Sequence, residues 1–143
     1  MIVLRAAAVT IALLGLCNAA SADPIGTWLT EGGKSHIKIA NCGGALCGSI
    51  VWLKEPNDPE TGKPKVDKFN ADAGKRSRPI IGVPIVINMK PNGAKKWSGQ
   101  VYNAEDGKTY DGNLTEQGPT SVRLEGCVMG GLVCKGQNWT RVN

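Results

Sequence analysis

The chain has 143 residues and a net charge of +5, with 20% of its residues charged. This length favours one domain, two at most. The positive charge is mild and scattered, and its densest group, Lys75-Arg76-Ser77-Arg78, is short. Nucleic-acid binding typically needs a basic face interleaved with aromatic side chains, so we expect no nucleic-acid partner.

The first 22 residues have the layout of a secretory signal peptide. Arg5 is their only charged residue, an apolar run follows over residues 6–16, and the small residues Ala20 and Ala22 mark a cleavage site. The run is shorter than the ~20 apolar residues that a membrane-spanning helix needs. We therefore expect cleavage after Ala22, no stable membrane insertion, and a periplasmic or secreted domain over residues 23–143.

Short β-like runs separated by turn residues fill the rest of the chain, and long helical periods are missing. The runs cover residues 25–31, 35–40, 46–54, 80–89, 97–103, 108–115, 121–128 and 132–142. In the second run Ile37 and Ile39 alternate with His36 and Lys38, which is typical of a strand with one buried face. The polar tract of residues 55–79 breaks the pattern and predicts a long loop, and such loops are usually functional or mobile.

About eight short strands, mostly joined by short turns, predict an all-β fold with a single small antiparallel up-and-down barrel. Asp106-Gly107 and Pro91-Asn92-Gly93 lie between runs and are hairpin signals. A sandwich is the alternative architecture for this spacing. A barrel of eight strands encloses either packed side chains or one small ligand.

Four of the five cysteines lie outside the signal peptide. Export places them where disulfides persist, and paired glycines between the partners favour two local bridges, Cys42–Cys47 and Cys127–Cys134. A four-cysteine zinc site is the alternative, but the six residues between the second pair exceed the usual spacing. Lipid attachment at Cys17 is disfavoured because a leucine rather than a small residue precedes it.

Trp28 stands near the start of the first run and Arg141 near the end of the last. The first and last strands of a closed barrel are neighbours, so we expect the guanidinium of Arg141 to cover Trp28, a contact of about 0.5–2 kcal/mol. A Gly-x-Trp on the first strand with an arginine on the last resembles the structural signature of the lipocalins and related calycins.

Nearly all of residues 24–143 also resembles a bacterial family, the exported domain of unknown function 2147. The resemblance is carried by Asp67, Asn70 and Gly82 and by residues 26–28, 46–53, 97–102, 106–110 and 137–141. Asn103-Ala104 departs from the Asp-Pro that the family often has there. The resemblance implies a periplasmic or secreted lipocalin-like barrel of unassigned function, with carriage of a small apolar molecule as one expected role.

The sequence contains no recognisable catalytic constellation. His36 is the only histidine, and its alternating strand indicates a solvated side chain; no Gly-x-Ser-x-Gly motif is present. Asp58, Glu60, Asp67 and Asp72 lie in the long loop and leave carboxylate hydrolysis open as an alternative, with plain solubilising residues favoured. We therefore expect no enzyme, no cofactor and no metal site.

The favoured function is a binding module that holds an apolar or amphipathic molecule inside the barrel. We expect Trp52 and Trp97 to line the interior, and Asp67, Asn70 and Arg78 to orient the ligand at the mouth. Each residue has a plainer interpretation: the tryptophans as core, and Asp67 with Asn70 as a turn that fixes the loop. The alternative function is an envelope structural or protein-interaction role with a filled barrel.

Overall fold

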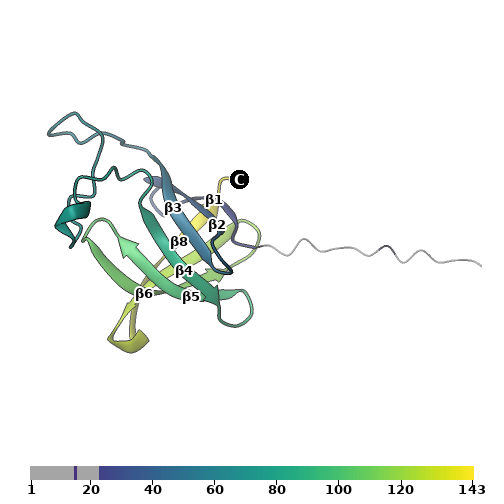
Figure 1. Cartoon of the computed structure of the whole chain (residues 1–143). Helices are drawn as coiled ribbons and strands as arrows, with labels where there is room; N and C mark the ends of the chain where they lie inside the picture. The colour runs from purple at the N-terminus through teal and green to yellow at the C-terminus, as the bar shows by residue number, and fades with distance from the viewer. Residues whose placement is uncertain (1–14, 16–22) are drawn as a thin grey trace, which may run out of the picture.

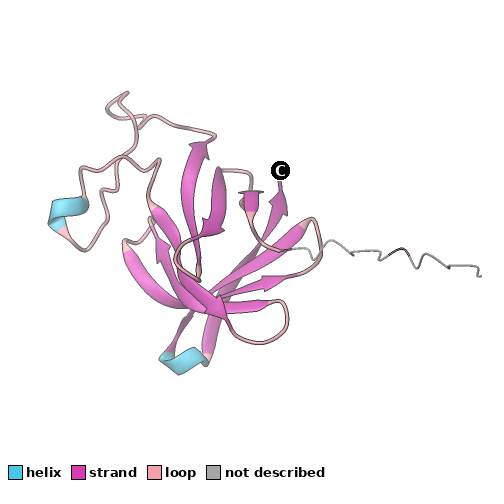
Figure 2. Cartoon of the chain, turned by 45° about the vertical axis from the view of Figure 1, so that its right-hand side comes forward, coloured by secondary structure: helices cyan, strands magenta, loops and turns pink. Residues whose placement is uncertain are grey.

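The computed structural model describes residue 15 and residues 23–143, so the predicted signal peptide lies outside the described residues except for Gly15. Each strand pairs antiparallel with the next, and the last pairs with the first to close a barrel (Figures 1 and 2). The eight strands are β1 (Gly26–Leu29), β2 (Ser35–Asn41), β3 (Leu46–Leu53), β4 (Pro84–Pro91), β5 (Lys96–Asn103), β6 (Lys108–Glu116), β7 (Ser121–Val128) and β8 (Val133–Arg141). The predicted all-β barrel is confirmed.

Alternation along the strands builds the core. Ile37 and Ile39 of β2 are 1% and 0% exposed, whereas Lys38 between them faces water. The same period of two buries Val122 and Leu124 on β7, because successive strand residues point to opposite faces. Within the described residues, no helix is long and apolar enough to cross a membrane.

The loops divide the barrel into two ends. The β2–β3, β4–β5 and β6–β7 turns meet at one end, which we call the floor. The β1–β2, β3–β4, β5–β6 and β7–β8 connections meet at the other, the mouth. The longest connection, residues 54–83, carries the short helix η1 (Ala73–Lys75) and extends from the mouth (Figure 2). It contains the predicted loop of residues 55–79.

The fourth strand begins later than residue 80, where the sequence predicts it. Residues 80–83 form a turn in which the Val83 amide donates to the Ile80 carbonyl at 3.0 Å, and Gly82 has φ of 104°. Pro84 then opens β4, a position where its missing N–H is tolerated. Ile80 and Val83 pack against the core, whereas Ile81 is 49% exposed. Gly82 and Val83 exchange backbone hydrogen bonds with Ile50 of β3, but the turn ends before β4 begins.

Trp52 does not share a face with Ile50, and the expectation that it lines the interior is wrong. His36 pairs with Trp52 while the next residue, Ile37, pairs with Ile50, so Val51 is a bulged extra residue. One extra residue reverses the faces that follow it. Trp52 is consequently 40% exposed and stacks on His36 outside the barrel, with ring centroids 4.3 Å apart.

Both predicted disulfides are present. Cys42–Cys47 closes the β2–β3 turn, and Cys127–Cys134 joins neighbouring positions of β7 and β8. Each loop is short, with five and seven residues of separation. On the loop-closure model, each bridge stabilises the domain by roughly 2–2.5 kcal/mol.

Candidate ligand-binding site

A cavity of about 1060 Å³ opens at the mouth of the barrel. This volume is slightly above the roughly 300–1,000 Å³ typical of small-molecule sites. Val66, Phe69 and Ile80 of the long loop form one side of the opening. The apolar part of its wall comes from strands: Ile37, Ile50, Leu53, Ile85, Val101, Leu124, Val128, Val133 and Trp139.

The floor half of the barrel is filled. Met89, Val86 and Leu114 are each fully buried there and do not border the cavity. Gly112 shows how tight this packing is, because a Cβ at that position would collide with the side chain of Val101. The interior is therefore divided into a packed floor and an open mouth, so a bound molecule would enter only part of the barrel.

Trp28 and Arg141 seal the floor. The Arg141 guanidinium carbon lies 4.3 Å from the centre of the fully buried Trp28 ring. Arg141 also donates to the carbonyls of Pro119, Ile25 and Asp23 at 2.7, 2.9 and 2.8 Å. One side chain thus ties the β6–β7 turn and the N-terminal segment to the last strand, which is the arrangement that the sequence predicts for these two residues.

Asp67, Asn70 and Arg78 come together, as a clamp on the long loop and not as groups facing the cavity. Asp67 is 0% exposed and accepts hydrogen bonds from the Tyr102 hydroxyl at 2.6 Å, the Asn70 amide at 2.9 Å and Arg78 Nε at 2.9 Å. Tyr102 belongs to β5, so these contacts hold the loop against the barrel. At the same place the Ala71 amide donates to the Gly107 carbonyl of the β5–β6 turn at 3.3 Å.

The clamp favours the ionised form of Asp67. Burial alone would raise its pKa, but the hydrogen bonds from Tyr102, Asn70 and Arg78 outweigh burial and hold the pKa below its ordinary value. For Tyr102, burial and the bond to Asp67 both raise the pKa of the phenol. All three donors are thus satisfied by one carboxylate, which leaves Asp67 no exposed surface for a ligand.

Asn70 and Arg78 border a second hollow on the outer surface, not the barrel cavity. This hollow, of about 820 Å³, lies between the η1 segment and the outer side of β5 and β6, with Lys75 and Lys108 on its edges. The expectation that these two residues and Asp67 orient a ligand at the barrel mouth is wrong in its placement. The plainer interpretation, a turn that fixes the loop, describes what they do.

Trp97 lies at the floor end and does not line the cavity, so that expectation is also wrong. It pairs with the fully buried Leu114 on one side and with Pro91, beside the β4–β5 turn, on the other. Four residues further along β5, Val101 occupies the cavity wall. Trp97 lies on the inner face of β5, as predicted, but the register of the strand places it in the packed floor half and below the cavity.

The wall also contains two polar residues that were not predicted from the sequence, Lys135 and Gln137. They alternate with Val133 and Trp139 on the inner face of β8. Gln137 is oriented by Trp139, whose indole N–H donates to its side-chain oxygen at 2.7 Å. Alternate residues of a strand share a face, so counting back by two from the buried Trp139 identifies Gln137 and Lys135 as inner-face residues.

Charged residues of both signs surround the mouth on the loops. Among the described residues there, Lys68 and Asp58 form an ion pair at 3.7 Å, and such exposed pairs contribute little stability. The lysines on the loops are Lys34, Lys54, Lys65 and Lys68. The acids are Glu31, Glu55, Asp58, Glu60, Glu105 and Asp106. The loops of the rim therefore carry two more acids than lysines.

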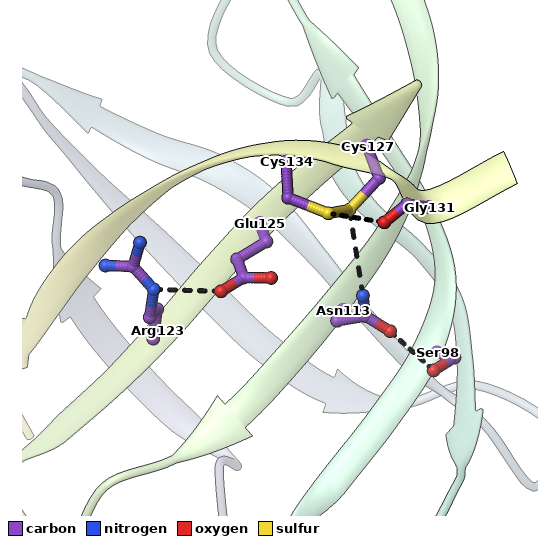
Figure 3. Close-up of a disulfide and its surroundings, with 7 residues drawn as sticks. All are labelled: Ser98, Asn113, Arg123, Glu125, Cys127, Gly131 and Cys134. Carbon is purple, nitrogen blue, oxygen red and sulfur yellow. Dashed lines mark hydrogen bonds and ion pairs between the residues drawn. A yellow bond between two sulfur atoms is a disulfide. The ribbon is translucent and has the colours of Figure 1, made fainter. Parts of the chain in front are cut away.

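Glu125, Cys127 and Cys134 lie close together on the outer face but do not offer three metal ligands. The two sulfurs are bonded to each other, and Glu125 accepts from Arg123 Nε at 3.0 Å (Figure 3). A thiolate is the form of cysteine that binds metals, and neither sulfur is free to adopt it. The predicted bridge thus takes the place of a thiolate site.

Comparisons with known proteins agree with this architecture. The structure resembles that of protein HP1028 from the human pathogen Helicobacter pylori, described as belonging to the lipocalin family, with a TM-score of 0.72 and 22% identity over 86% of this chain and 85% of that one. No curated protein matches the chain. A family model described as an uncharacterized protein conserved in bacteria matches residues 26–141. The chain therefore belongs to this family, DUF2147, and has a lipocalin-like barrel.

Proposed function

We propose that this protein is an exported binding protein that holds one apolar or amphipathic molecule in the mouth half of its barrel. The observation that carries the proposal is the cavity itself, whose strand wall is mainly aliphatic with Trp139 at its base. Apolar ligand surface buried there contributes about 25 cal/mol per Å². The two disulfides support a periplasmic or secreted location, because such bonds persist in oxidising compartments.

A plug variant tests the proposal directly. Gly126 lies on the cavity wall, and a Cβ there meets Tyr110 at an ordinary 3.4 Å, so Gly126→Val is expected to fold while its methyl groups project into the cavity. We expect the neutral fluorophore N-phenylnaphthylamine to bind the wild-type protein saturably, and Gly126→Val to weaken that binding at least about tenfold, the equivalent of roughly 1.4 kcal/mol. The matched control, Trp52→Leu, alters an outer apolar side chain and should bind as the wild type does.

Two results would count against a ligand-binding role. One is the absence of saturable binding to the wild-type protein. The other is equal affinity of the wild type and the plug variant at unchanged melting temperature, which would place the fluorophore outside the barrel. Mass spectrometry of an organic extract of the protein purified from cells then identifies any native molecule.

A protein-interaction role is the second candidate, and the β7–β8 tip favours it. Met129 and Leu132 are 71% and 84% exposed on the short turn that contains η2 (Met129–Gly131). Exposed apolar side chains that are grouped in this way mark contact surfaces more often than single ones do. If the protein acts through a protein partner, replacing both residues with serine should abolish capture of that partner from an envelope extract. Fluorophore binding should stay unchanged.

A further inference from the structure

Lys135 has an unusual position for a charged side chain. Among the described strand residues that border the cavity, it is the only one with a charge. The other charged residues around the opening stand on loops, whereas Lys135 belongs to the inner face of β8 between Val133 and Gln137. Lys135 is exposed, so it stands on the open side of the space that the aliphatic wall encloses.

The surroundings of Lys135 leave its ammonium accessible to a guest. Its neighbour across the strand pair is Gly126, which contributes no side chain. The Tyr110 side chain lies on the other side of Gly126, and its hydroxyl donates to Asp106. No ion pair in residues 23–143 involves Lys135. Within that part of the chain, Lys135 therefore has no direct ion-pair partner.

We infer that the bound molecule is an amphipathic anion whose headgroup pairs with Lys135 while its apolar tail lies against Leu124 and Trp139. This inference rests on the proposed ligand-binding function and narrows the ligand class. Carboxylates and phosphates are the anions that accept charge-assisted hydrogen bonds from an ammonium most strongly. A cationic headgroup at the same depth would meet like charge, and a neutral one would leave the exposed ammonium with water as its partner.

Four ligands with the same tail test the inference on the full mature chain at neutral pH. They are dodecanoate, dodecyl phosphate, dodecanol and dodecylamine, each used below its aggregation threshold and measured by calorimetry. We expect the anions to bind about tenfold more tightly than the alcohol, and the amine to bind most weakly. Lys135→Met should lower the affinity for the anions to that for the alcohol, and leave the affinity for the alcohol unchanged. Lys34→Met, on the β1–β2 loop, should keep the preference.

Each outcome has a distinct meaning. Preference for only one of the two anions supports the inference and identifies the headgroup. An anion preference that survives in Lys135→Met, or that is lost equally in Lys34→Met, overturns it while the cavity keeps its binding role. If none of the four ligands binds the wild-type protein and the fluorophore also fails to bind, the proposed function itself fails, and the inference fails with it.

Discussion

Replacing Asp67 with asparagine is expected to destabilise the domain through the clamp. The side chain keeps its shape and one acceptor oxygen, but its new amide group faces the donors of Asn70 and Arg78 in place of a carboxylate oxygen. Two accepted hydrogen bonds and the neutralising charge for Arg78 are lost together. Because Asp67 is fully buried, water cannot reach the position and compensate.

The magnitude follows from these contacts. A hydrogen bond to a charged group contributes about 1.5–3 kcal/mol net, and Arg78 is 32% exposed, so solvent recovers part of its share. We therefore expect the free energy of unfolding to fall by about 2–4 kcal/mol. For a domain of this size, that loss corresponds to a fall in melting temperature of roughly 8–15 °C.

Thermal unfolding followed by circular dichroism measures the effect. Glu60→Gln, which neutralises an exposed acid of the same loop, is the matched control and should leave the melting temperature within about 2 °C of the wild type. In a double-mutant cycle, Asp67→Asn with Arg78→Met should be less than additive, because the second change removes the unpaired cation. Additivity, or a fall in melting temperature no larger than that of the control, would refute the clamp.

The pH dependence has a defined sign. The folded-state pKa of Asp67 lies below its ordinary 3.8, so the carboxylate stabilises the fold fully above about pH 4. That contribution disappears as the pH falls through the lower, folded-state value. The difference in melting temperature between wild type and Asp67→Asn should therefore be constant near neutrality and shrink in strong acid. A difference that grows on acidification would contradict an ionised clamp.

Three further outcomes are expected. Arg141→Met removes the guanidinium from the floor and should lower the unfolding free energy by about 2–3 kcal/mol in denaturant titration, with no change in ligand affinity. Gly112→Ala forces its Cβ into Val101 and should destabilise by about 1–3 kcal/mol in the same assay, whereas no loss would contradict the tight floor packing. Replacing Cys127 and Cys134 together with serine should lower stability by roughly 2–2.5 kcal/mol, and reducing agent should then have less effect than on the wild type.

The sequence predicts those features of the barrel that depend on neighbours along the chain. Alternation identified the strands, the paired glycines identified both bridges, and the opposite ends of the chain placed Trp28 against Arg141. Trp52 and Trp97 were misplaced because strand register decides which face of the barrel a side chain is on and how far it lies from the mouth. A single bulged residue, Val51, is enough to reverse a face.

The clamp depends on contacts that sequence patterns do not encode, whereas the position of the wall lysine follows from strand alternation. Asp67 and Tyr102 are 35 residues apart, and their contact depends on how the long loop folds back. The residue types indicated a turn, since acidic and amide side chains favour turns. They did not indicate that Tyr102 would be the contact partner of Asp67. Lys135 was within reach of sequence reasoning, because the alternation of β8 is regular and Trp139 marks its buried face.

The seam between β1 and β8 has a consequence for how the domain matures. Trp28 pairs with Arg141 and Leu29 with Thr140, and Thr27 adds backbone hydrogen bonds with Val142 and Asn143. The two strands that meet at this seam are the first and the last along the chain. The cylinder is therefore complete only after its final strand has paired with the first. Until then, both outer strands present unpaired backbone groups that can join other chains, so a delay at this last step exposes the protein to aggregation.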